Sequence, residues 1–403
     1  MKESYDVLVV GAGPAGSAAA RKCVGEGLKT LLVEKHKLPR RKACSGIIAN
    51  KSYNYVLENF GPIPEDAHGK PYYNLGMAFH FPSVGTVFGK MECYAPYVWR
   101  DKFDYFLAKK SGADLEDQTR FISAKENGDK VEVTLAQRKD TVKVDARYVI
   151  GADGANSHVI RNIAPEAYEG IPWAFAIQKY YEGKIDADNR FLYGFLVRGM
   201  GPFPWLNLKD DQIIVGLASP LEEKWEPKFE LLLNYLKKNF GLEIKRELAT
   251  EGCLANLMTP LNRFFPGRGR VLIAGEAMGL MHQGDEGISC ALASGGIAGE
   301  AVIRGVKGED ALAVYKRLVK PEMEIALDQF NPFRIIESSS SFSSPRRPKM
   351  LVGFSLREKA RLMRDAWDFV KNELLAVGGI GSAVLKNTLR RQILRKYRIP
   401  AAD

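Results

Sequence analysis

Cysteine and histidine are scarce in this sequence, and long apolar runs are absent. Only five of the 403 residues are cysteine and only five are histidine. The cysteines are widely spaced and form no Cys-x-x-Cys pair, so we expect neither disulfides nor a metal site. No stretch approaches the roughly 18–20 apolar residues that span a bilayer, and Met1 leads directly into charge and a strand, unlike a signal peptide. These absences predict a cytoplasmic protein without a membrane-spanning helix.

The chain is long enough for two or three domains. Apolar residues make up 46% of it and charged residues 26%, a balance that excludes disorder and predicts a buried core. The net charge of +10 is uneven, because residues 331–403 carry fifteen Lys and Arg against six Asp and Glu. A basic end on a nearly neutral body predicts contact with an anionic surface, either lipid headgroups or nucleic acid.

A glycine-rich turn follows the first apolar segment. Residues 5–10 form a short apolar segment rich in valine, which predicts a central parallel strand. The sequence Gly-Ala-Gly-Pro-Ala-Gly follows at residues 11–16. Gly11 permits the tight turn, Gly13 lets backbone amides approach a pyrophosphate, and Gly16 lets the next helix lie close to the strand. The helix N-terminus adds its partial positive charge to that phosphate site.

A second apolar strand at residues 30–33 ends in an acid, Glu34. A carboxylate there can accept hydrogen bonds from the ribose hydroxyls of an adenosine. Strand, glycines, helix, strand and acid in this order predict a dinucleotide site, with an incidental glycine turn as the alternative. The predicted contacts are Gly11, Gly13, Ala15, Gly16, Glu34 and Lys35.

Two later segments favour FAD as the dinucleotide. Residues 147–154 read as a strand that runs into Asp-Gly, and residues 270–279 read as a strand that runs into Gly-Glu, before a small-residue helix. An acid at a strand end can bind a ribityl or ribose hydroxyl, and a helix N-terminus can face the second phosphate or the flavin. The predicted contacts here are Asp153, Gly154, Gly275, Glu276, Gly287 and Ile288.

Residues 5–34, 147–161 and 270–299 resemble segments of the FAD-dependent flavoproteins that include p-hydroxybenzoate hydroxylase, flavin halogenases and geranylgeranyl reductases. Residues 100–107 match the Arg-x-x-Phe-Asp-x-x-Leu helix start of the same group. The resemblance implies FAD as cofactor and a role for Arg100 near the pyrophosphate or ribityl chain; alone, Arg100 would read as a surface arginine.

The resemblance also implies an α/β fold, with a Rossmann-like FAD-binding domain interleaved with a mixed β-sheet substrate domain and followed by a helical tail. The expected divisions are an FAD-binding domain at 1–165 and 266–330 with an inserted segment at about 50–98, a substrate domain at 166–265, and a basic helical region at 331–403.

Residues 42–46, Lys-Ala-Cys-Ser-Gly, look like the Lys-x-Cys-x-Gly segment of geranylgeranyl reductases. The resemblance places the cysteine near the flavin ring and makes Cys44, Ser45 and Gly46 cofactor contacts. A thiol there can modulate flavin reactivity or donate a proton, and Arg40, Arg41 and Lys42 would favour its thiolate. A small residue that only packs beneath the ring is the alternative.

Residues 201–211 contain Pro-Phe-Pro-Trp where geranylgeranyl reductases carry Tyr-x-Trp-x-Phe-Pro. We expect Phe203 and Trp205 to line the substrate cavity, because an aromatic wall suits a polyprenyl chain. It would suit a flat aromatic substrate equally well, and both residues could instead be plain core.

Two departures from the family pattern concern the later motifs. Glu276 stands in place of the usual aspartate, and the loop at 282–287 lacks the usual proline. His282 in that loop is a candidate general acid, with a solvated loop histidine as the alternative.

The remaining segments read as helices: 222–240, 309–330, 355–375 and 382–398, with a serine-rich break at 338–348. Residues 382–398 form a basic amphipathic pattern, typical either of an anionic membrane surface or of a helix packed on the body with a solvated rim. No binding motif accompanies the charge, so nucleic acid is not an expected partner.

The resemblance to geranylgeranyl reductases implies an FAD-dependent reductase that hydrogenates C=C bonds of a prenyl chain on a lipid, quinone or pyrrole. Its electron donor would be NAD(P)H or a ferredoxin-like carrier, because no second Gly-x-Gly-x-x-Gly motif appears. The alternatives are an oxygen-using aromatic hydroxylase, a halogenase, or a non-catalytic flavin sensor or lipid-transfer protein. The expected location is the cytoplasm, with attachment to the cytoplasmic face of a membrane left open.

Overall fold

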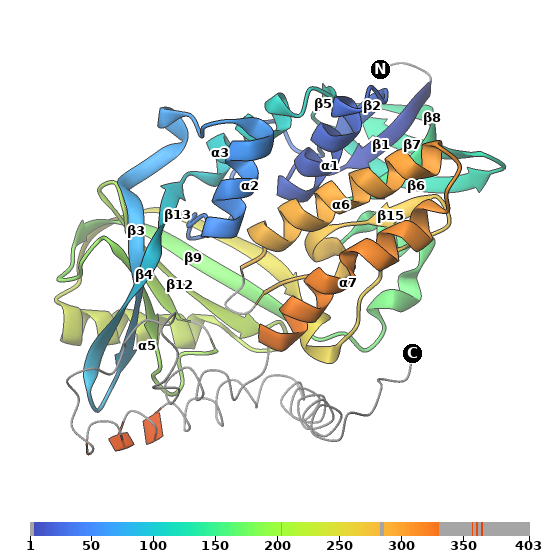
Figure 1. Cartoon of the computed structure of the whole chain (residues 1–403). Helices are drawn as coiled ribbons and strands as arrows, with labels where there is room; N and C mark the ends of the chain where they lie inside the picture. Colours follow the sequence, from blue (N-terminus) through green and yellow to red (C-terminus); the bar gives the residue numbers. More distant parts are fainter. Residues whose placement is uncertain are drawn as a thin grey trace.

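The computed structural model describes residues 4–202, 204–282 and 286–329, and five separate residues between 357 and 365. Two β-sheets lie side by side, each with helices against it (Figure 1). The predicted contact Phe203 and the basic helix at 382–398 fall outside the described residues.

The first sheet has a parallel centre in the order β15–β8–β1–β2–β5. An antiparallel hairpin joins it at β8, and one short strand flanks β15. Its strands are β1 (Ser4–Val10), β2 (Thr30–Val33), β5 (Asp114–Glu116), β6 (Thr119–Asn127), β7 (Lys130–Gln137), β8 (Asp140–Gly151), β14 (Gly267–Arg268) and β15 (Val271–Ile273). The central strands are buried on both faces, as their continuous apolar runs predict.

Helices α1 (Pro14–Gly25), α6 (Ile288–Val306) and α7 (Ala311–Gln329) cover this sheet. Helices α1 and α6 pack closely because small residues meet: a Cβ on Gly295 would lie 2.1 Å from the carbonyl oxygen of Ala15. Shorter helices surround them: α2 (Asn50–Phe60), α3 (Arg100–Lys110) and α4 (His158–Ile163).

The second sheet has seven strands in the order β13–β9–β12–β11–β10–β3–β4. They are β3 (His68–Phe81), β4 (Gly85–Val98), β9 (Trp173–Lys184), β10 (Phe191–Phe195), β11 (Trp205–Lys209), β12 (Gln212–Pro220) and β13 (Glu243–Asn256). Helix α5 (Glu226–Phe240) packs its apolar side, including Leu232 and Leu236, against one face. We call the opposite face, which contacts residues 44–46, the inner face.

The α/β class expected from the sequence is confirmed. The strands within the segment 50–98 behave differently from a simple insertion in the FAD-binding domain: β3 pairs in parallel with β10, so they complete the second sheet. None of the described helices is both long and apolar enough to cross a bilayer.

Candidate functional site

The turn after β1 is built around glycines that no other residue can replace. Gly11 has φ +103°, and a Cβ on it would lie 2.5 Å from the carbonyl oxygen of Ala152. A Cβ on Gly16 would lie 1.8 Å from the carbonyl oxygen of Gly11. A Cβ on Gly13, the N-cap of α1, would be in ordinary van der Waals contact with a guanidinium nitrogen of Arg40, at 3.5 Å. The first amides of a helix have no partner within the helix, so those of Ala15 and Gly16 are the donors that an anion at this turn would use.

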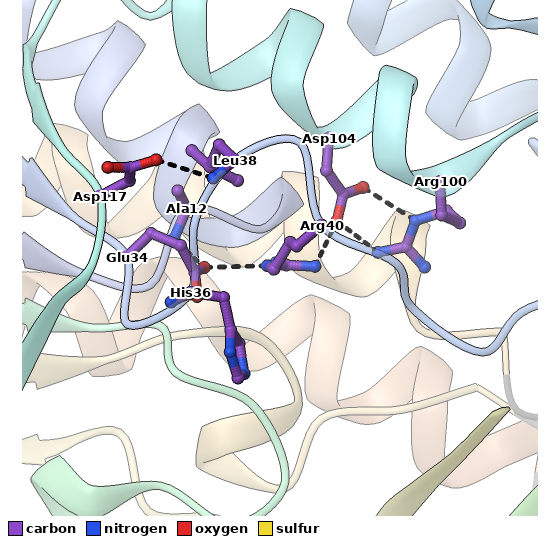
Figure 2. A network of polar contacts seen from close by, with 8 residues as sticks. All are labelled: Ala12, Glu34, His36, Leu38, Arg40, Arg100, Asp104 and Asp117. Carbon is purple, nitrogen blue, oxygen red and sulfur yellow. Dashed lines mark hydrogen bonds and ion pairs between the residues drawn. The ribbon is translucent and has the colours of Figure 1, made fainter.

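Glu34 lies at the end of β2, buried beside this turn (Figure 2). Its Oε2 accepts hydrogen bonds from the amide of Ala12 at 3.3 Å and from Nε of Arg40 at 3.0 Å, and its Oε1 accepts from the amide of His36 at 3.1 Å. Lys35, the next residue, is exposed. The carboxylate is thus fixed where the sequence predicts an adenosine ribose.

Arg40 links Glu34 to a second acid on α3 (Figure 2). Its Nη1 lies 3.2 Å from Oδ2 of Asp104, and Asp104 also binds Arg100 through both carboxylate oxygens, at 2.8 and 2.9 Å. Asp104 is fully buried between the two guanidinium groups. The sequence named Arg100 as a cofactor contact but missed this role of Arg40, because Asp104 lies 64 residues away and no local pattern connects them.

Asp153 lies at the end of β8, in the turn with Gly154. Its Oδ2 accepts from the amides of His158 at 2.6 Å and Val159 at 3.2 Å, at the start of α4. Its Oδ1 is buried without a hydrogen-bond partner in the described part of the chain. Burial raises the pKa of this carboxyl. An unpaired buried oxygen costs free energy unless a ligand donates to it.

Gly275 and Glu276 follow β15, beside α1. A Cβ on Gly275 would lie 3.0 Å from Cβ of Ala15, so this turn also requires glycine. Burial raises the pKa of the Glu276 carboxyl, while the cations Lys42 and Arg100 oppose that rise. The predicted acid is therefore enclosed next to two basic groups.

The loop before α6 holds His282 and Glu286. His282 is buried, with its Nδ1 3.1 Å from Oε2 of Glu286, and its Nε2 has no partner among the described residues. Glu286 Oε1 also accepts from the amide of Ser289, in the first turn of α6. Gly287 and Ile288 begin that helix as expected. His282 is therefore a buried, oriented side chain and not the solvated loop histidine of the alternative interpretation.

Cys44, Ser45 and Gly46 lie against the inner face of the second sheet. Gly46 has φ +77°, and its amide donates to Sγ of Cys44 at 3.3 Å. Gln178 Nε2 lies 3.4 Å from the carbonyl oxygen of Cys44, and Asn207 Nδ2 lies 2.9 Å from that of Ser45. The loop is therefore fixed to the second sheet, and Cys44 also packs against an apolar cluster that includes Ala18 of α1.

Two of the three cations expected beside Cys44 are paired with acids. Arg40 lies 3.0 Å from Glu34 and 3.2 Å from Asp104, and Arg41 lies 3.4 Å from Glu251. Electrostatic interaction links Cys44 to Lys42, the third expected cation, and also to Arg100 and Lys209. Arg100 and Lys209 come from distant segments that sequence neighbours cannot indicate.

The inner face is more polar than the aromatic wall expected from the sequence. The Trp205 indole lies across Gly216, where a Cβ would come within 2.2 Å of it. Strand β9 presents Gln178 and Tyr180 on the same face, and the Tyr180 hydroxyl donates to Glu251 Oε2 at 2.8 Å. The indole nitrogen and the side-chain oxygens of Gln178 and Asn207 are buried, with no partner in the ranges that the structure describes. These atoms can exchange hydrogen bonds with a bound molecule.

Comparison with known proteins identifies the first part of the chain. Residues 4–175 match the family model described as the FAD binding domain. The chain is an FAD-dependent flavoprotein. The residues fit that cofactor, because Glu34 is a buried acid beside the glycine turn and Asp153 carries a buried oxygen without a partner in the described part of the chain.

Its relatives are diverse. An uncharacterised protein of Methanosarcina barkeri is 29% identical over 326 residues, which cover 76% of each chain. The protein CbrA of Escherichia coli K12 is 26% identical over 303 residues, which cover 72% of this flavoprotein and 82% of CbrA.

Solved structures show the same fold. A geranylgeranyl bacteriochlorophyll reductase-like protein of Thermoplasma acidophilum superposes with a TM-score of 0.72 at 20% identity, covering 98% of this chain and 99% of that one. The flavin-dependent brominase Bmp2 superposes with a TM-score of 0.67 at 18% identity, covering 97% and 100%. At these identities the likeness establishes the fold, and the flavoprotein is an FAD-dependent oxidoreductase of unassigned reaction.

Proposed function

We propose that this flavoprotein is a reductase that adds hydrogen across C=C bonds of an apolar, isoprenoid-type substrate. The observation that carries the proposal is the loop at residues 44–46, which holds a cysteine against the inner face of the second sheet and against an apolar cluster that includes Ala18 of α1. The fold shared with a geranylgeranyl bacteriochlorophyll reductase-like protein supports the same assignment.

The chain's own residues would divide the work as follows. The first turn of α1 would bind the pyrophosphate, and Glu34 would bind the adenosine ribose. Asp153 and Glu276 would bind hydroxyl groups of the cofactor. When bound, FAD supplies the hydride. Cys44 or His282 would hold the proton for the other alkene carbon, since the Nε2 of His282 has no partner among the described residues and the Cys44 thiol lies on the loop beside the inner face.

One observation favours a second function, an oxygen-using monooxygenase. The polar groups on the inner face, among them Gln178, Tyr180 and Glu251, suit a substrate with hydroxyl or carbonyl groups better than a plain hydrocarbon. Halogenases and monooxygenases also share the fold.

Reoxidation of the reduced flavoprotein separates the two functions. Dithionite-reduced protein mixed anaerobically with a prenyl alkene should recover the absorbance of oxidised flavin and leave a product heavier by two hydrogens per bond. Cys44→Ala should keep its FAD yet slow this step, whereas Cys23→Ala, in the buried interior of α1, should not. Reoxidation only by O2, with one oxygen added to an aromatic substrate, would refute the reductase and support the monooxygenase.

The remaining partners also belong to the proposal. NAD(P)H or a ferredoxin-like carrier would reduce the flavin. The basic segment at residues 382–398 would hold the protein reversibly on an anionic membrane, where a water-insoluble prenyl substrate is collected.

A further inference from the structure

One peptide group lies between a buried lysine and the thiol of Cys44. The carbonyl oxygen of Ser45 accepts hydrogen bonds from Nζ of Lys209 at 3.2 Å and from Nδ2 of Asn207 at 2.9 Å. The amide at the other end of that peptide, on Gly46, donates to Sγ of Cys44 at 3.3 Å. Hydrogen bonds therefore connect the Lys209 ammonium to the Ser45–Gly46 peptide, and that peptide to the sulfur of Cys44.

The geometry of this loop is tightly constrained. A Cβ on Gly46 would lie 2.1 Å from the carbonyl oxygen of Val98 and 2.8 Å from Nζ of Lys209. The same lysine nitrogen donates to the Val98 carbonyl oxygen at 2.9 Å, so it joins the loop to the end of β4. Lys209 thus holds three segments together: β11, the loop and β4.

Lys209 is 1% exposed, and the hydrogen-bond acceptors of its Nζ in the described part of the chain are two carbonyl oxygens. Its Nζ lies 3.9 Å from the centre of the Trp99 ring, a cation–π contact. Burial lowers its pKa to about 8, and Cys44, Asp210, Asp101 and Glu251 oppose that fall. The side chain is therefore mainly an ammonium at neutral pH, stabilised by carbonyl dipoles and one aromatic face.

We propose that Lys209, assisted by Asn207, is a positioning residue that activates Cys44 through the Ser45–Gly46 peptide. The inference rests on the proposed function only in giving Cys44 a chemical role. A cation on the carbonyl oxygen polarises the peptide, and a polarised peptide is a stronger amide donor to sulfur.

Alkylation of Cys44 tests this relay without any substrate. The FAD-loaded protein is treated with iodoacetamide at pH 7, and the labelling of the Cys44 peptide is followed by mass spectrometry. Lys209→Met should slow labelling about five- to tenfold, because a charge-assisted hydrogen bond is roughly twice as strong as a neutral one. Asn207→Leu removes one neutral donor and should slow it about twofold. Lys179→Met, a charge on β9 paired with Glu247, is the matched control and should change nothing.

The opposite results overturn the proposal. If Lys209 merely held the loop in place, its removal would loosen the loop and make Cys44 react faster. An unchanged rate, or a wild-type Cys44 that is labelled only after denaturation, also excludes activation by the relay. If Lys209→Met does not fold, the labelling rate of Asn207→Leu alone tests the proposal. Failure of alkene reduction would leave these rates unaffected, so the two hypotheses fail separately.

Discussion

The ammonium of Lys209 makes a sharp prediction about how the stability of the folded protein depends on pH. Its pKa falls from the ordinary value of 10.5 to about 8, with burial the main cause. Because each pKa unit corresponds to about 1.4 kcal/mol, burying the charged form costs about 3 kcal/mol relative to the neutral form. The side chain is almost completely buried, so solvent screening reduces this figure little.

The direction follows from where protons are bound. Below pH 8 both the folded and the unfolded chain carry the Lys209 proton, so the full cost of burying the charge lowers the stability of the folded state. Between pH 8 and 10.5 the unfolded chain binds more protons than the folded one, so this lysine makes the folded state more stable as the pH rises. By pH 9.5 the gain amounts to about 2 kcal/mol relative to pH 7.

Urea unfolding of the wild type and of Lys209→Met isolates this contribution, since all other titrating groups are common to both proteins. The difference in unfolding free energy should shift in favour of the wild type by about 2 kcal/mol between pH 7 and 9.5. Lys179→Met, which replaces a partly exposed lysine on β9, should show no such trend. A flat difference for Lys209→Met would mean that the buried ammonium does not titrate in this range, and the reasoning from its burial would be wrong.

Three further outcomes are expected. Gly16→Ala should prevent FAD loading, measured by flavin absorbance per chain, because its Cβ would lie 1.8 Å from a carbonyl oxygen; Gly25→Ala, with nothing within 4 Å, should load normally. Glu34→Gln should weaken FAD binding at least tenfold in equilibrium titrations, because a charged acceptor for the ribose is lost; equal affinity would contradict its role. Truncation after Gly381 should abolish salt-sensitive cosedimentation with anionic liposomes and preserve the flavin spectrum, and undiminished sedimentation would contradict docking through 382–398.

The cofactor turn could be predicted because its determinants are local. The Gly11–Gly16 motif, the strand before it and Glu34 lie within one short stretch, where sequence spacing fixes spatial spacing. The backbone contacts of Gly11 and Gly16 explain why only glycine fits there. Such motifs describe the first sheet well, since β1, β2, β8 and β15 are each followed by a predicted cofactor contact.

Of the charges around Cys44, Lys42 is expected from the sequence, but Arg100 and Lys209 could not be predicted because they are distant in sequence. Arg40 and Arg41 are near neighbours, yet they pair with acids elsewhere. Lys209 lies 164 residues from Ser45 and still donates to its carbonyl oxygen. The pairing of β3 with β10 is likewise invisible to composition or periodicity, since it depends on which sheet edge is open.

The inner face shows why an apolar strand pattern is a poor guide to a substrate cavity. Side chains alternate along β9, so Ile177 and Tyr181 pack toward α5 while Gln178 and Tyr180 face the loop of Cys44. The apolar side chains of β9 pack into the core beneath α5, and the polar side chains on its other face line the site. A substrate that fits must therefore donate hydrogen bonds to the buried amide oxygens of Gln178 and Asn207, even if the rest of it is hydrocarbon. A prenyl chain with a polar headgroup meets this demand, whereas a bare hydrocarbon would leave the amide oxygens of Gln178 and Asn207 unpaired.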